Sequence, residues 1–165
     1  MVLAAESRAT NHEKSLNIYL HSTLVTADGL DVLFPGAKTI YAPSGSLWVV
    51  VEYLLGVSRR FRGAVKADGS IGNYTTGIIN LNCCEFVAQR TDRYALPGLR
   101  DTVMSRVNEG NTIPIRDYDT GGNPVVGYWS ILSVTENPVS DGLGQGDNGI
   151  AVWNVSAFGD YIEVI

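Results

Sequence analysis

The pattern of apolar and polar positions is clearest from Gly77 to Asn108, where it predicts a strand, a polar turn and a helix. Successive side chains on a strand point to opposite faces, so residues 77–87 present one apolar and one polar face. The apolar face carries Ile79, Leu81, Cys83 and Val87, and the polar face carries Asn80 and Asn82. Apolar residues at helical spacing predict the helix, and residues 109–111 end it. The apolar residues of this stripe are Leu96, Leu99, Val103 and Val107. A helix that returns across the apolar face of the preceding strand forms the core of a small α+β domain.

The same spacing predicts an earlier helix from about His12 to Val25, with Asn11 as its N-cap. Residues 1–10 before it are expected to be a loose N-terminus. His12 and His21 do not share a face of this helix, and both are expected at the surface. The apolar stripe of the helix consists of Leu16, Tyr19, Leu20, Thr23 and Leu24.

Runs of β-branched and aromatic residues bounded by turn residues predict the remaining strands. They are residues 30–34, 47–55, 57–66, 125–134, 149–156 and 158–165, with shorter extended pieces at 38–41 and 113–115. Residues 47–55 are apolar on both faces and predict a central strand, with 57–66 as its neighbour. In 125–134 the expected shared face is Val126, Tyr128, Ser130, Leu132 and Val134. Residues 67–76 are expected to be a polar loop, and residues 136–148 a long Gly-rich loop.

These elements predict one α+β domain over residues 1–165. Its expected architecture is a mostly antiparallel mixed sheet of five to seven strands with two helices packed on one face. The formal net charge of −5 argues against a general nucleic-acid binder, which needs many Lys and Arg contacts to phosphate. The longest apolar run, residues 47–51, is too short to span a bilayer, so no membrane partner is expected.

No common catalytic signature is present, and the expectation is that the chain is not an enzyme. The glycines of residues 142–146 lack the strand–turn–helix context of a nucleotide loop. Residues 117–119 lack the full spacing of a calcium loop and are interpreted as a polar turn. Cys83 and Cys84 are neighbours, too close for an ordinary disulfide, and are interpreted as small reduced hydrophobes. No catalytic, cofactor-binding or metal-binding residue is therefore assigned.

The candidate site is a basic run, Arg59, Arg60 and Arg62, on the predicted strand 57–66. Such a strand is either an edge blunted by charge against aggregation or a surface that faces another subunit or a polyanion. Both interpretations remain open from the sequence.

The order of elements resembles a known family. A Pro-containing turn follows the first helix at residues 32–36, and Tyr41-Ala42-Pro43 precedes the apolar strand 48–53. A Gly-led strand opens at residues 77–81, and the second helix ends in Asn108-Glu109-Gly110 before Thr112-Ile113-Pro114-Ile115. From about Leu16 to Ile165 this order resembles the tail terminator or tail completion proteins of long-tailed bacteriophages, including related minor tail proteins.

The resemblance implies a structural virion protein without cofactors. Such a protein caps the tail tube as a homo-hexameric ring, ends tail polymerisation and provides the joint to the head connector. Its implied partners are other copies of itself, the tail tube protein and the head–tail connector proteins, with non-specific contact to DNA in the lumen. Its implied location is the neck or tail of the virion, after assembly in the host cytoplasm.

Two alternatives stay open. One is another head–tail joining protein or a tail tube subunit, which would polymerise rather than stop as one ring. The other is a small enzyme or ligand-binding α+β domain, which would show a deep pocket with convergent polar groups.

Overall fold

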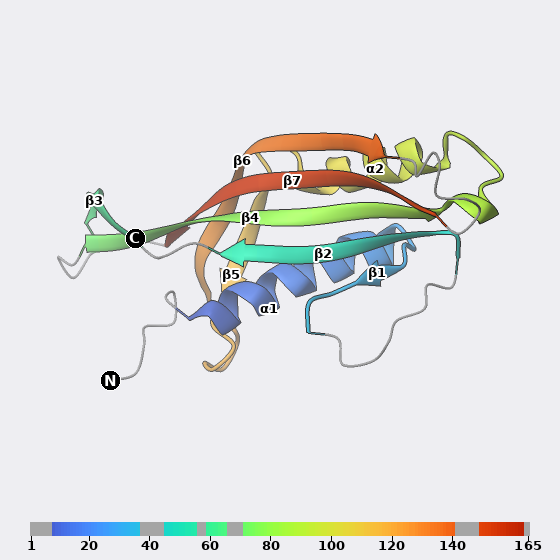
Figure 1. Cartoon of the computed structure of the whole chain (residues 1–165). Helices are drawn as coiled ribbons and strands as arrows, with labels where there is room; N and C mark the ends of the chain where they lie inside the picture. The colour runs from blue at the N-terminus through green and yellow to red at the C-terminus, as the bar shows by residue number, and fades with distance from the viewer. Residues whose placement is uncertain (1–7, 37–44, 56–58, 66–70, 141–148, 164–165) are drawn as a thin grey trace.

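The computed structural model describes residues 8–36, 45–55, 59–65, 71–140 and 149–163. The predicted loose residues 1–7, the extended piece 38–41 and residues 141–148 of the predicted loop lie outside these ranges. Within them the chain forms a seven-stranded sheet in the order β1-β2-β4-β7-β6-β5, with β3 also paired to β4 (Figure 1). Among the strand pairs of the described ranges only β1 and β2 are parallel, so the predicted mixed and mostly antiparallel sheet is confirmed.

Strand β4 (Ile71–Phe86) is the axis of the sheet. One edge of β4 pairs with β7 (Ile150–Glu163) from Tyr74 to Phe86. Its other edge pairs with β2 (Leu47–Leu55) and, beyond the end of β2, with β3 (Arg59–Val65). The expectation that β3 neighbours β2 is therefore wrong.

The beginning of β4 was expected to be a polar loop, and this too is wrong for residues 71–76. These residues have few apolar side chains, but their backbone pairs with β3 on one side and, from Tyr74, with β7 on the other. Strand pairing gives the backbone N–H and C=O groups their hydrogen bonds whatever the side chains are. The pattern of side chains therefore underestimates the length of the strand.

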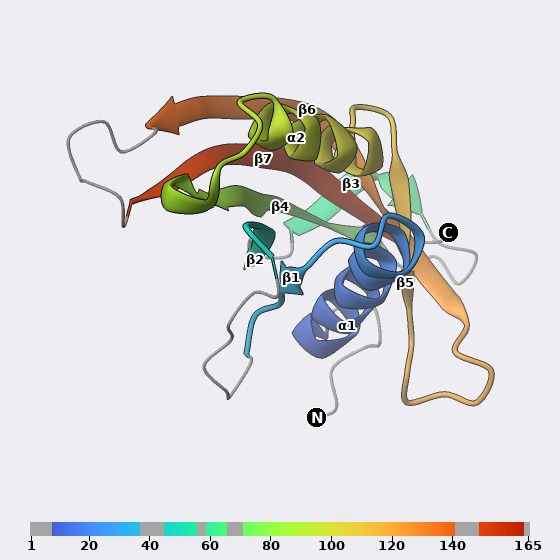
Figure 2. The same ribbon diagram turned by 90° about the vertical axis from the view of Figure 1, so that its right-hand side faces the viewer.

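Both helices lie on the concave side of the curled sheet, as predicted (Figure 2). Helix α1 (Ala9–Leu20) continues as a π-helical segment, η2 (His21–Ala27), before the short β1 (Val32–Leu33). After β4, the 3₁₀ turn η3 (Val87–Gln89) leads to α2 (Ala95–Val107), and β5 (Thr112–Arg116) and β6 (Val125–Ser140) follow. No helix in these ranges is long and apolar enough to cross a membrane.

A single core joins the helices to the concave face. Its helical members are Leu16, Leu20, Leu24, Leu96, Leu99, Val103 and Val107, all buried. Its strand members include Val49, Val51, Ile79, Leu81, Cys83, Ile113, Ile115, Trp129, Ile131, Val155 and Tyr161. The predicted apolar stripes of both helices and of β4 are thus confirmed where they face the sheet.

The first helix starts earlier than predicted, at Ala9, with Arg8 rather than Asn11 as its N-cap. Asn11 is buried, and its side-chain oxygen accepts a hydrogen bond from the backbone N–H of Tyr118 at 3.3 Å. A residue type that favours N-caps serves here to join the first turn of α1 to the chain after β5.

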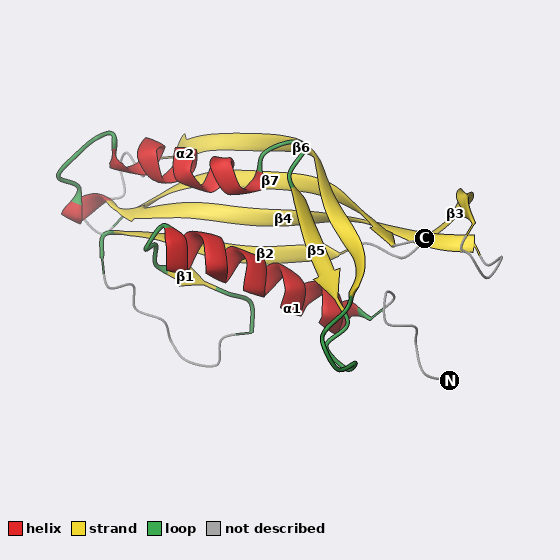
Figure 3. Ribbon diagram, turned by 180° about the vertical axis from the view of Figure 1, so that it is seen from behind, coloured by secondary structure: helices red, strands yellow, loops and turns green. Residues whose placement is uncertain are grey.

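Strand β6 bends along its length (Figure 3), and a register shift between Ile131 and Ser133 inserts Leu132 as a bulge. Before the bulge Trp129 and Ile131 face the core, and after it Val134 does. The expected shared face of residues 126–134 is therefore wrong, because one inserted residue reverses the alternation.

Two predicted boundaries near the C-terminus also change. Residues 136–140, expected in a loop, belong to β6 and pair with β7 through Glu136↔Val155 and Ser140↔Val152. The two strands expected at 149–156 and 158–165 are one strand, β7, because Ala157 pairs without a break with Ile79.

Candidate functional site

The predicted site residues Arg59, Arg60 and Arg62 all lie on β3. Arg59 pairs with Tyr74 of β4 and Arg60 with Asn73, and a register shift follows before Val65. Figures 1 and 3 show β3 at the end of the sheet that extends beyond both helices. The positions of these arginine side chains lie outside what the structure describes, so only the strand itself is placed.

The convex face of the sheet carries no helix of the described ranges, and it holds most of the exposed apolar side chains. Eight large apolar side chains are exposed in these ranges, and six belong to this helix-free face or to the bulge beside it. They are Leu54, Tyr128, Leu132, Ile150, Val152 and Phe158. This concentration on one face is what an interaction surface shows, whereas isolated exposed apolar residues are ordinary.

Strand register arranges the helix-free face in rows. Leu54 pairs with Ile78, and Ile78 with Phe158, which faces Ser133 next to the bulge at Leu132. Leu54 is 59% exposed, Leu132 57% and Phe158 38%, so this apolar row is open to solvent. At the other end of the face Trp48 packs on Phe86, with ring centroids 4.4 Å apart.

A polar ladder separates the two apolar ends. The side-chain amide of Asn154 donates to Oδ1 of Asn82 at 2.8 Å, and the hydroxyl of Ser156 donates to Oδ1 of Asn80 at 2.7 Å. The predicted polar face of β4 is therefore confirmed, and its amides are bonded to β7. Such cross-strand pairs stabilise the sheet.

The four longest strands of the helix-free face carry acids and no base among their described outward residues. On the outward positions of β2, β4, β6 and β7 the charged side chains are Glu52, which is exposed, and Asp160, which is partly buried; both are acids. Burial raises the pKa of the Asp160 carboxyl.

Charges on the concave side are paired within the chain. Arg106 donates to both carboxylate oxygens of Asp28, at 2.9 and 2.6 Å, and these bonds hold the pKa of Asp28 below its usual range. Arg100 binds Glu136, whose Oε2 also accepts a hydrogen bond from Nε1 of Trp153 at 3.0 Å. These contacts join α2 to Asp28 after η2, to β6 and, through Glu136, to β7.

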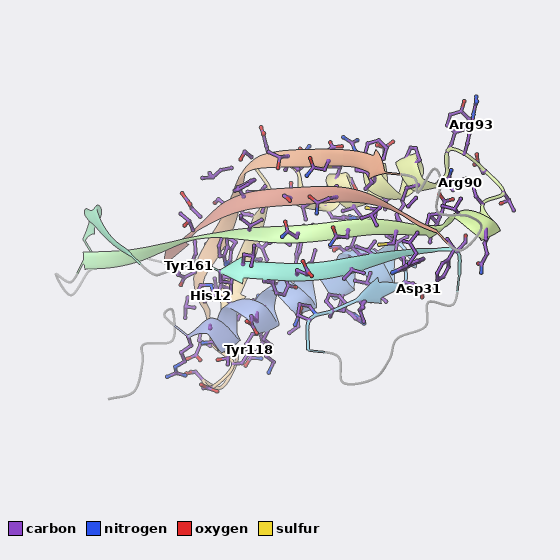
Figure 4. All side chains as sticks on the ribbon, in the orientation of Figure 1. His12, Asp31, Arg90, Arg93, Tyr118 and Tyr161 are labelled. Atoms are coloured by element: carbon purple, nitrogen blue, oxygen red, sulfur yellow. The ribbon has the colours of Figure 1, made fainter. Side chains whose placement is uncertain are left out.

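His12 is 5% exposed, so the expectation of a surface histidine is wrong for it. Nε1 of Trp129 donates to Nδ1 of His12 at 3.1 Å, and the His12 ring meets Tyr161 edge to face at a centroid distance of 4.4 Å. Figure 4 shows His12 and Tyr161 close together where α1 crosses the sheet. An indole N–H inside a core needs an acceptor, which explains a buried imidazole here. His21 is exposed, as predicted.

Metal-binding side chains are not clustered in the described part of the chain. No cluster of three or more His, Cys, Asp or Glu side chains there could hold a metal ion. Cys83 and Cys84 are free, and burial raises the pKa of Cys83 to about 12 and that of Cys84 to about 11. Thiols with such pKa values are poor nucleophiles at neutral pH. Both side chains are buried, as expected for small hydrophobes.

An open groove of about 460 Å³ lies between η2 and the segment after β1. It is lined by Asn17, Ile18, His21, Ser22, Thr26 and Phe34. The lining is mainly apolar, and its polar side chains come from one helical face rather than converging from several elements.

The helix-free face was missed as a site by sequence reasoning, although β7 contains a signal for it. From Ile150 to Phe158 large apolar residues occupy both alternating sets: Trp153 and Val155 face the core, while Val152 and Phe158 face outward. A strand that is apolar on both faces predicts burial on both faces, by the chain itself or by a partner.

The Arg100–Glu136 pair supplies a pH-dependent prediction. Hydrogen bonds from Arg100 hold the pKa of Glu136 below its ordinary value of 4.5, so folding favours the carboxylate. The stabilisation is therefore complete above pH 4.5 and is lost as the pH falls through the depressed value. Arg100→Met should lower the free energy of unfolding by about 1 kcal/mol at pH 7 and by much less at pH 3, measured by urea unfolding. An equal loss at both pH values would contradict the assignment.

No protein-family profile and no curated protein matches this sequence. Among solved structures, one whose name describes no function superposes with a TM-score of 0.51 at 11% identity, over 93% of this chain and 96% of the other. This likeness shows the fold alone. Another, described as "Virion of native gene transfer agent (GTA) particle", has a TM-score of 0.45 at 12% identity, over 92% of this chain and 94% of the other. A likeness at that score carries no argument about function.

Proposed function

We propose that this chain is a structural virion protein of a long-tailed bacteriophage. It caps the tail tube as a ring, ends tail polymerisation and provides the joint to the head connector. The observation that carries the proposal is the order of elements, which resembles the tail terminator proteins from the first helix to the last strand. The curled mixed sheet with both helices on one side agrees with the fold that this resemblance implies.

The free face of the sheet supports an assembly role. A ring subunit needs rigid side surfaces that bind its neighbours and end faces that bind different partners. Here an extended sheet leaves one face uncovered by the described helices and apolar, and β3 stands at its far end. The proposed partners are other copies of the chain, the tail tube protein and the head connector, and the proposed location is the virion neck. No catalytic step is part of the proposal.

Tail tubes assembled in the presence of the purified protein test this function. Terminator action predicts tubes of limited length, each with extra density at one end in negative-stain images. Glu109→Arg, a charge change on the exposed turn after α2, serves as a control for altered protein charge. Tubes that lengthen without limit and carry no cap would contradict the proposal, and incorporation along the tube wall would identify a tube subunit instead.

A further inference from the structure

We propose that the helix-free face of one copy binds β3 of the next copy, so that the arginines of β3 meet the two carboxylates of that face. This inference rests on the proposed function, for which it names the contact between subunits. It also selects between the two sequence interpretations of Arg59, Arg60 and Arg62: the strand is a subunit contact.

The composition of the face favours a protein partner. Its exposed apolar rows are separated by an amide ladder, and the charged residues at its described outward positions are Glu52 and Asp160 on the long strands and Arg116 on the edge strand β5. Depletion of charge around exposed aromatic and aliphatic side chains is typical of the core of a protein–protein interface. The long strands of the face carry two acids and no base among their described residues, which disfavours nucleic acid and anionic lipid as partners.

The composition of β3 is complementary to this face. Its seven residues, Arg59–Val65, contain three arginines and no acid, in a chain whose formal net charge is −5. The strand also carries the apolar residues Phe61 and Val65. Opposite charge on two surfaces gives association its specificity and its register.

Topology prevents β3 from covering the face of its own chain. Arg59 and Arg60 pair with β4, so β3 lies within the sheet rather than over it. It also extends beyond both helices, where a neighbouring molecule can reach it (Figures 1 and 3). A contact between two different surfaces of identical chains is head-to-tail, and such contacts close into rings when the rotation allows.

Charge reversal on each side of the contact tests the proposal. Strand β3 is called the arm here, and the arm variant is Arg60→Glu/Arg62→Glu. The face variant, Glu52→Arg/Asp160→Asn, changes the helix-free face. Alone, each variant places like charges together, and its dissociation constant for self-association should rise at least about tenfold. Mixed in equal amounts, the arm of each variant meets a complementary face of the other, so the mixture should recover ring formation.

The readouts are mass by light scattering and negative-stain images, with circular dichroism to show that each variant folds. Because Asp160 is partly buried, Glu52→Arg alone is a second face variant that changes only an exposed side chain. Glu13→Arg/Glu109→Arg is the matched control, since it reverses two exposed acids on α1 and the turn after α2. The control should assemble as the wild type does.

Each other outcome overturns the contact. If the wild type forms rings and the arm and face variants form them too, the proposed contact is wrong and the proposed function still holds. If ring formation recovers only when the arm and face changes are combined in one chain, and not in the mixture, the arginines and carboxylates pair within a chain. Loss of DNA retention by the arm variant, with assembly unchanged, would assign β3 to DNA in the lumen. A wild type that never assembles would overturn the contact together with the ring.

Discussion

Gly159→Ala should lower the free energy of unfolding by about 2–3 kcal/mol, because the indole of Trp129 occupies the space beside this glycine. A Cβ at Gly159 would lie 2.8 Å from Cε3 of Trp129 and 2.9 Å from the carbonyl oxygen of Ser130. Gly77 pairs with Gly159 across β4 and β7, and a Cβ there would lie 2.5 Å from Cη2 of the same indole. Trp129 cannot easily move aside, since it is buried and bonded to His12.

A double-mutant cycle separates the indole from the backbone contact. In a Trp129→Phe background the outer ring is gone, so Gly77→Ala should cost much less than in the wild type. Gly159→Ala should recover only in part, because the Ser130 carbonyl remains. Gly98→Ala on α2 is the control: no atom lies within 4 Å of its Cβ, and alanine favours a helix, so the variant should be as stable as the wild type or more so. Equal losses at all three glycines, measured by urea unfolding, would contradict the packing explanation.

Arg90→Ala should lower the free energy of unfolding by about 3 kcal/mol, because it leaves the buried carboxylate of Glu85 without its cation. Glu85 is 2% exposed, and its Oε2 accepts a hydrogen bond from Nε of Arg90 at 2.9 Å. The partner guanidinium is itself 26% exposed, so the expected loss is at the lower end for a broken buried pair.

The double variant Glu85→Gln/Arg90→Ala tests the charge explanation. It removes both charges while nearly keeping the side-chain volume at position 85, so it should be more stable than Arg90→Ala alone. Arg93→Ala is the matched control, since Arg93 lies on the same connection, is exposed and contacts the neighbouring Tyr94. Its expected loss is below about 0.5 kcal/mol. If Arg93→Ala costs as much as Arg90→Ala, the loss reflects the connection and not the buried carboxylate.

The helices and the middle of β4 follow a repeating apolar pattern, and the sequence was enough to predict them. Leu96, Leu99, Val103 and Val107 face the core as their spacing indicates. The bounds predicted for the strand at 47–55 are those of β2. In these elements the side chains that face the core recur at a regular spacing in the sequence, so the local pattern is enough to predict the element.

The errors share a physical cause: each depends on a contact between residues distant in the sequence. His12 is buried because Trp129, 117 residues away, needs an acceptor for its indole N–H. The bulge at Leu132 reverses the alternation in the middle of β6, and no residue preference marks that position. The apolar residues on both faces of β7 signal a partner surface, but the pattern of a single strand cannot distinguish a covering helix from a second molecule.

The ring is tested most directly by the mass of the purified protein in solution, measured by light scattering over a wide concentration range with negative-stain images of the same sample. The expected species has six times the 17.8 kDa mass of the chain and appears as a closed ring, either alone or on the ends of tail tubes. Long tubes of this protein would contradict a terminator and indicate a tube subunit. A compact monomer at every concentration, with no affinity for tail tubes or connectors, would contradict the virion role itself.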